Sequence, residues 1–94
     1  MYMIFWTIQA KEQYVGLLTQ LKETGAGAAA MELDDLIQKL ESRLSLFPNS
    51  CPASSQNPDF RRCVISKQIS VIVEVKGPVV FIVAVLNNKG RQAV

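Results

Sequence analysis

The stretch FRRCVISKQISVIVEVKGPVVFIVAVL, residues 60–86, decides the fold of this 94-residue chain. It reads as three strands, over residues 60–67, 68–76 and 79–86, because β-branched and aromatic side chains alternate with a polar turn and with Gly77-Pro78. Such closely spaced strands predict antiparallel hairpins. The charges and the Gly-Pro turn interrupt an apolar run that would otherwise suit a membrane span, so we expect no membrane partner.

The first half of the chain supplies one more strand and two helices. Its first residues are aromatic and β-branched, as in a strand. Apolar residues then recur at three- and four-residue steps, which predicts a helix that begins near Thr7 or Gln9 and ends near Gly25, and a second helix that Pro48 stops. The order β-α-α-β-β-β predicts an α+β fold: an antiparallel sheet with two antiparallel helices packed on one face. We expect one domain over residues 1–94, because so short a chain cannot bury two cores.

Surplus apolar surface is the first sign of a binding function. Two helices can cover one face of a four-stranded sheet, yet the last strand is apolar on both sides, as in strands that are buried on both faces. We expect the surplus to bind a partner protein or a second copy of the chain, unless the loop over residues 48–59 covers it. The candidate contacts are aliphatic side chains of the first helix and the last strand: Leu18, Val80, Ile82 and Leu86.

Charge divides unevenly between the halves. Residues 1–47 carry four basic and six acidic side chains and residues 48–94 carry six and two, so the halves have net charges of −2 and +4 within a total of +2. The basic half favours an acidic partner, a nucleic acid included. The candidates for binding a nucleic acid or another target are Arg61, Arg62, Lys67, Lys89 and Arg91.

Cysteine and histidine content bounds the chemistry and the compartment. The chain has no histidine and two cysteines, Cys51 and Cys63, so the usual zinc ligand sets are missing and we expect no metal and no cofactor. Two cysteines do not make a disulfide framework, so we expect free thiols in a reducing cytoplasm. The apolar start lacks the basic leader of a secretion signal, and we therefore expect a cytoplasmic protein.

Three patches of the sequence resemble the RelE/ParE toxins of bacterial type II toxin–antitoxin pairs. They are Phe5-Trp6-Thr7 with Ala10, the Phe47-Pro48 stop before a Pro/Ser-rich loop, and RRCVISKQIS at residues 61–70, which is similar to the ParE-like branch. The resemblance spans nearly the whole chain and implies the same β-α-α-β-β-β fold. The chain departs from the pattern at residues 71–74, where that branch usually has aromatics and an arginine. It keeps only part of the family's Asp-Asn-Arg-Gln-like ending.

The resemblance implies a toxin, of the kind found in plasmid stabilisation, that binds a cognate antitoxin. Members of the family bind DNA gyrase or cleave ribosome-bound mRNA, and the nucleases need groups that transfer protons. This chain has no histidine and no tyrosine near its C-terminus, so we expect protein–protein binding rather than catalysis, with gyrase as a candidate target. The alternatives are an mRNA endonuclease, a degenerate toxin that binds only its antitoxin, and a self-associating domain that forms a homodimer.

Overall fold

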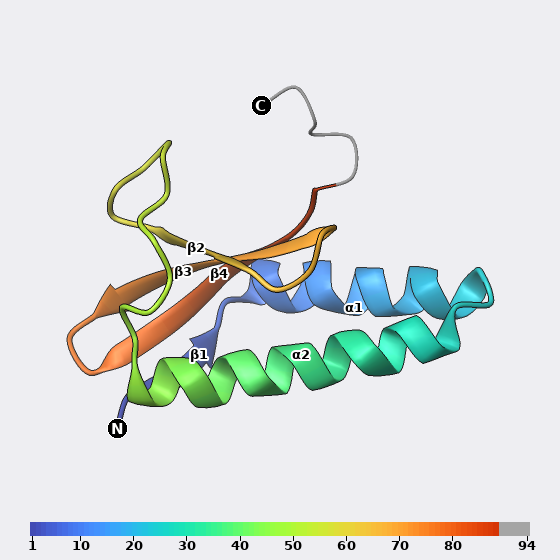
Figure 1. Ribbon diagram of the computed structural model, residues 1–94, viewed down its shortest axis with the longest axis horizontal. Helices are drawn as coiled ribbons and strands as arrows, with labels where there is room; N and C mark the ends of the chain where they lie inside the picture. Colours follow the sequence, from blue (N-terminus) through green and yellow to red (C-terminus); the bar gives the residue numbers. More distant parts are fainter. Residues whose placement is uncertain (89–94) are drawn as a thin grey trace.

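The computed structural model describes residues 1–88 and has six elements (Figure 1): β1 (Met3–Trp6), α1 (Ile8–Glu23), α2 (Gly27–Leu46), β2 (Arg61–Val64), β3 (Ile69–Lys76) and β4 (Val79–Asn87). This order confirms the predicted β-α-α-β-β-β arrangement and the α+β class. The two helices run antiparallel along one face of a four-stranded sheet (Figure 1). None of the helices within residues 1–88 has the length and apolarity needed to cross a membrane.

Local sequence signals set the ends of the helices. Thr7 is the N-cap of α1, and its hydroxyl accepts a 3.1 Å hydrogen bond from the backbone N–H of Ala10. Gly25 follows the end of α1 with a φ of +82°, in the left-handed region that glycine adopts without steric cost. The chain can therefore reverse within a few residues and start α2 at Gly27.

The sheet is mixed, so the prediction of an antiparallel sheet is wrong for one strand pair. The strand order is β1-β4-β3-β2, and β1 pairs with β4 in parallel while the other two pairs are antiparallel. The reason is that a pair of antiparallel helices restores the chain direction. The end of α2 returns to the start of β1, where the Tyr2 N–H donates to the Ser45 carbonyl at 2.8 Å. β2 therefore runs in the same direction as β1. Two antiparallel hairpins follow, β2–β3 and β3–β4, so β4 also runs parallel to β1.

The core fills the space between the helices and the sheet. Val80 and Ile82 of β4 have no exposed surface and form its centre, together with buried residues of both helices and of β2 and β3. The pairing register shifts next in the strand: Ile82 lies opposite Val73, whereas Ala84 lies opposite Ile72. Val83 therefore has no partner on β3 and forms a β-bulge, after which Val85 rather than Ala84 is buried.

Cys51 and Cys63 form a disulfide, so the prediction of two free thiols is wrong. The loop after α2 turns back along β2, where Ala53 makes an antiparallel bridge with Arg61. This places the two cysteine Cα atoms 5.2 Å apart although the cysteines are 12 positions apart in the sequence. The loop composition gave no sign of this pairing, because nothing in a Pro/Ser-rich stretch specifies which strand it follows.

Candidate partner-binding groove and basic side chains

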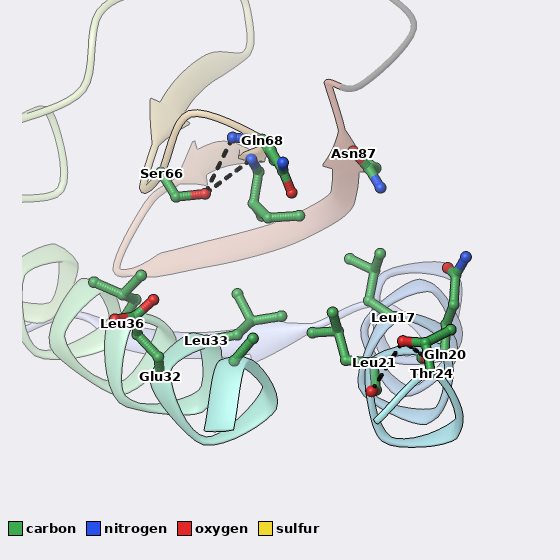
Figure 2. Close-up of a pocket in the computed structure, with 12 residues that line it drawn as sticks. Leu17, Gln20, Leu21, Thr24, Glu32, Leu33, Leu36, Ser66, Gln68 and Asn87 are labelled. Atoms are coloured by element: carbon green, nitrogen blue, oxygen red, sulfur yellow. Dashed lines mark hydrogen bonds between the residues drawn. The ribbon is translucent and has the colours of Figure 1, made fainter. Parts of the chain in front are cut away.

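A groove lies between the helix hairpin and one end of the sheet. The joined ends of α1 and α2 extend past the sheet, so the sheet covers only part of the hairpin (Figure 1). The space left there has a volume of about 440 Å³. Residues of both helices, of the turn between β2 and β3 and of the end of β4 line it (Figure 2): Leu17, Gln20, Leu21, Thr24, Ala29, Glu32, Leu33, Leu36, Ser66, Gln68, Ile69 and Asn87.

The floor of the groove is apolar and continuous with the core. Leu17 and Leu21 extend from α1, Leu33 and Leu36 from α2, and Ile69 from the start of β3. Leu33 and Ile69 are buried, Leu17 and Leu21 are partly buried and pack against the core, and Leu36 is partly buried. A guest side chain in the groove would therefore extend the hydrophobic core, which is the main source of free energy in protein association.

The rim of the groove is polar and partly fixed by hydrogen bonds. The Ser66 hydroxyl accepts hydrogen bonds from the backbone N–H groups of Gln68, at 3.2 Å, and Ile69, at 3.1 Å (Figure 2). These bonds shape the turn that overhangs the groove. Gln20 and Glu32 lie on the helix side of the same rim. The groove thus combines an apolar floor with a polar rim, a composition common among protein-binding sites.

None of the four predicted apolar contact residues lies in this groove. Val80 and Ile82 are completely buried, so a partner cannot reach them in this structure. Leu18 is partly buried against the core and lines a separate cavity of about 400 Å³ with other residues of the two helices. Leu86 follows the bulge and is half-buried opposite Ser70 on β3. The helical periodicity already placed Leu17 and Leu21 on the apolar stripe of α1, but it could not show that the sheet ends before reaching them.

Arg62 is held in place on the face of the sheet opposite the helices. Its Nε donates to the Ser70 hydroxyl at 3.2 Å, and its Nη2 donates to Asn88 Oδ1 at 2.8 Å. Asn88 closes the triangle through a 2.9 Å hydrogen bond from Nδ2 to the same hydroxyl. Ser70 is completely buried, so the Nε side of the guanidinium is bonded to a fixed group. Among residues 1–88, Arg62 has no ion pair with a carboxylate, which leaves its charge available to an acidic ligand.

The other basic candidates are dispersed. Arg61 points the opposite way from Arg62, as adjacent strand residues do, and its Nη1 donates to the Cys51 carbonyl at 2.7 Å. Lys67 is exposed in the turn between β2 and β3. Lys89 and Arg91 lie outside the described residues. None of the other described basic candidates lies at the cluster of Arg62, Ser70 and Asn88. The sequence predicted Arg62 but not this cluster, because the cluster joins residues that are distant in the sequence.

The sheet face opposite the helices, which we call the open face, carries exposed apolar side chains on both of its edge strands. Met3 and Phe5 of β1 are 70% and 56% exposed, and Val64 of β2 is also exposed. Phe5 packs edge-on against Phe81 of β4, with ring centroids 5.5 Å apart. The described chain thus leaves an aromatic pair and a fixed arginine on the same face of the sheet.

Proton-transfer chemistry finds little support in the described residues. Burial, and secondarily a 2.6 Å hydrogen bond to Asp34, raises the pKa of the Tyr14 hydroxyl well above its usual value, but this group faces α2 and lies on neither surface. Within residues 1–88, no three His, Cys, Asp or Glu side chains are placed to hold a metal ion together.

Comparison with known proteins shows similarity in fold but not in sequence. No family model and no curated protein matches the sequence. A solved structure described as "Chromosomal ParDE TA system from P. aeruginosa" superposes with a TM-score of 0.75 at 17% identity, over 93% of this chain and 96% of that chain. The fold is that of the RelE/ParE toxins.

Two further toxin-like structures share the RelE/ParE fold. YafQ from E. coli strain BL21(DE3) has a TM-score of 0.59 at 9% identity, over 97% of this chain and 98% of that one. The YoeB/ParE toxin from Agrobacterium tumefaciens has a TM-score of 0.55 at 14% identity, over 90% and 96% of the two chains. These matches confirm the predicted RelE/ParE fold across most of the chain. At such low identity they show the fold alone, so the role of each residue has to be argued from this structure.

Proposed function

We propose that this chain is the toxin component of a type II toxin–antitoxin pair and that it acts by protein–protein binding. The observation that carries the proposal is the groove between the helix hairpin and the end of the sheet, whose apolar floor no other described segment covers. The likeness to a solved ParDE system supports the assignment. The proposal extends to a cytoplasmic location and to a single domain over residues 1–94.

The proposed occupant of the groove is an amphipathic helix of the antitoxin. A helix presents apolar side chains at positions i, i+3, i+4 and i+7, and this stripe would pack on the groove floor formed by Leu17, Leu21, Leu33 and Leu36. The polar flanks of the same helix would meet the rim, where Glu32 favours a basic side chain. The groove accommodates one such stripe, so we expect one antitoxin helix for each toxin.

We assign the target to the open face, away from the antitoxin groove. Arg62, fixed by Ser70 and Asn88, would bind an acidic group of the target, and the Phe5–Phe81 pair would supply apolar contact. DNA gyrase is the proposed target, because poisoning by binding needs no proton-transfer group. An mRNA endonuclease would need a general acid or base near Arg62. The groups that hydrogen-bond Arg62 are a hydroxyl and an amide, and Glu74, the carboxylate on the same sheet face, forms an ion pair with Lys76.

Expression of the chain alone and with its candidate antitoxin tests the proposal. We expect growth arrest that co-expression of an antitoxin-like protein from an adjacent gene relieves, inhibition of gyrase supercoiling by the purified chain, and intact mRNA in a purified translation assay. Codon-specific mRNA cleavage that Arg62→Ala abolishes would replace binding with the endonuclease alternative. A chain that neither arrests growth nor binds that gene product, but associates with itself, would contradict the toxin role.

A further inference from the structure

The Cys51–Cys63 disulfide fastens a short segment of the loop to the outer edge of the sheet. Residues 51–54, which we call the edge segment, run beside β2. The Arg62 N–H donates to the Pro52 carbonyl at 3.0 Å, and the Ser54 N–H donates to the Phe60 carbonyl at 2.7 Å. The segment thus covers backbone groups of an edge strand that would otherwise be open to another chain. The disulfide is its covalent attachment to β2.

Two guanidinium groups converge on Cys51. Arg43, near the end of α2, places its Nη2 atom 3.4 Å from the Cys51 Sγ atom, and Arg61 donates to the carbonyl of the same residue. The ion pairs found within residues 1–88 involve neither arginine, so neither charge is neutralised by a carboxylate there. A positive charge beside a sulfur stabilises the thiolate and makes that sulfur a better leaving group in thiol–disulfide exchange.

A cleft leads to the disulfide. Its volume is about 320 Å³, and its lining includes both cysteines together with Arg43, Pro52 and Val64. The two cysteines are only 3% and 1% exposed, so the bond is shielded but lies at the wall of an open space rather than deep between the helices and the sheet. A small dithiol in the cleft is therefore within reach of the sulfur atoms.

We propose that the Cys51–Cys63 disulfide is a redox switch that holds or releases the edge segment. This inference rests on the proposed function for one premise, the cytoplasmic location, where disulfides are usually transient or redox-sensing. The reductant is a dithiol. One of its thiolates attacks the Cys63 sulfur, the S–S bond breaks, and the electron pair leaves on the Cys51 sulfur beside Arg43.

The remaining steps complete a two-electron reduction. The reductant is now joined to Cys63 through a mixed disulfide. Its second thiolate attacks the reductant sulfur of that bond, which releases the Cys63 thiolate and leaves the reductant as a disulfide. Both cysteine thiolates can then take protons from water. Reduction removes the covalent tie, so the edge segment separates from β2, the outer edge of the sheet becomes available for strand pairing, and Arg61 loses the carbonyl that positions it.

Hydrogen exchange on the full chain under native conditions tests this switch with dithiothreitol as the probe. We expect alkylation to find two thiols after treatment, and the amides of Ser54 and Arg62 to exchange at least about tenfold faster. The amides of the central strand β4 should stay protected. Replacement of both cysteines by serine should give the same local loss of protection without a reductant. Thiols that appear only when β4 also loses protection, or edge amides that do not respond, would overturn the proposal.

Arg43 provides a second test with a matched control on the same helix. Arg43→Gln should slow reduction roughly three- to tenfold, because the Cys51 thiolate loses its neighbouring charge. Lys39→Gln removes an exposed charge one turn earlier, where Lys39 pairs with Asp35 rather than with a sulfur, and should leave the rate unchanged. Equal rates for the two variants would contradict the role of Arg43. Antitoxin binding is measured separately, so a chain that binds no antitoxin but still shows this response would sink the proposed function and leave the switch standing.

Discussion

Trp6 donates a 2.8 Å hydrogen bond from its indole Nε1 to Glu41 Oε2, which joins β1 to α2 across 35 positions of sequence. The same indole packs against Tyr14 of α1, with ring centroids 5.4 Å apart. The first strand is therefore held by both helices. β1 is an edge strand of four residues, and this side-chain anchoring supplements its pairing with β4.

Removing the acceptor of this bond should destabilise the fold. Glu41→Ala leaves the half-buried Trp6 N–H without its partner, and we expect the free energy of unfolding to fall by about 1.5–3 kcal/mol. Glu41→Gln keeps an acceptor and should cost less. Glu23→Ala, at the exposed end of α1, is the control and should change stability by under about 0.5 kcal/mol. Urea denaturation measures all three, and equal losses at Glu41 and Glu23 would contradict the anchoring role.

Substitutions in the groove should weaken antitoxin binding without unfolding the chain. Leu17→Gln places a polar side chain on the groove floor, and losing one buried leucine contact corresponds to about tenfold or more in affinity. Val15→Gln lies on nearly the opposite side of α1, where Val15 is 59% exposed, and should bind normally. Calorimetric titration with the antitoxin checks the difference. Similar affinities for the two variants would place the antitoxin elsewhere.

Alkaline pH should weaken the packing of α1 on α2 through Tyr14. Burial and the hydrogen bond to Asp34 raise the pKa of Tyr14 in the folded chain, so the fold favours the neutral hydroxyl. Its contribution to stability is complete below the unfolded pKa of about 10 and is lost as the pH rises above that value. Tyr14→Phe should flatten the fall in stability between pH 9 and pH 11, measured by urea denaturation. Tyr2→Phe serves as the comparison, and an equal flattening there would show that Tyr14 is not responsible.

Loss of the disulfide should lower stability by an amount typical of a short closed loop. Replacing both cysteines by alanine should reduce the free energy of unfolding by about 2–4 kcal/mol, because the unfolded chain is no longer constrained. Wild-type protein unfolded in the presence of a dithiol should show nearly the same stability as this variant. A large difference between those two samples would mean that the alanine side chains, rather than the missing bond, cause the loss.

The sequence predicted the elements of this fold better than it predicted their contacts. Thr7 acts through its side-chain hydroxyl, and Gly25 and Pro48 act through their backbone conformation, so the limits of the helices could be read locally. The direction of β1 relative to β4 depends on how the two antiparallel helices restore the direction of the chain. The pairing of Cys51 with Cys63 depends on the path of the loop after α2. No local pattern encodes either of these.

The surfaces that we propose to bind partners were likewise only partly visible in the sequence. The apolar stripe of α1 and the surplus apolar surface were visible in the sequence, and the open face confirms the surplus. The groove required the relative position of a helix hairpin and the end of a sheet, which only the assembled fold supplies. Strict alternation cannot say which side of an apolar strand the helices cover, so the sequence does not show that Val80 and Ile82 are buried against them.

The β-bulge at Val83, which has no partner on β3, determines which face of the sheet each later residue of β4 presents. Before this bulge the even-numbered residues Val80 and Ile82 face the helices, and after it the odd-numbered Val85 does. Without the extra residue, Asn88 would point toward the helix layer and Arg62 would lose one of its two side-chain acceptors. A single added residue thus turns Asn88 to the face of Arg62, and relatives aligned by hydrophobic alternation alone would be out of step by one position beyond this point.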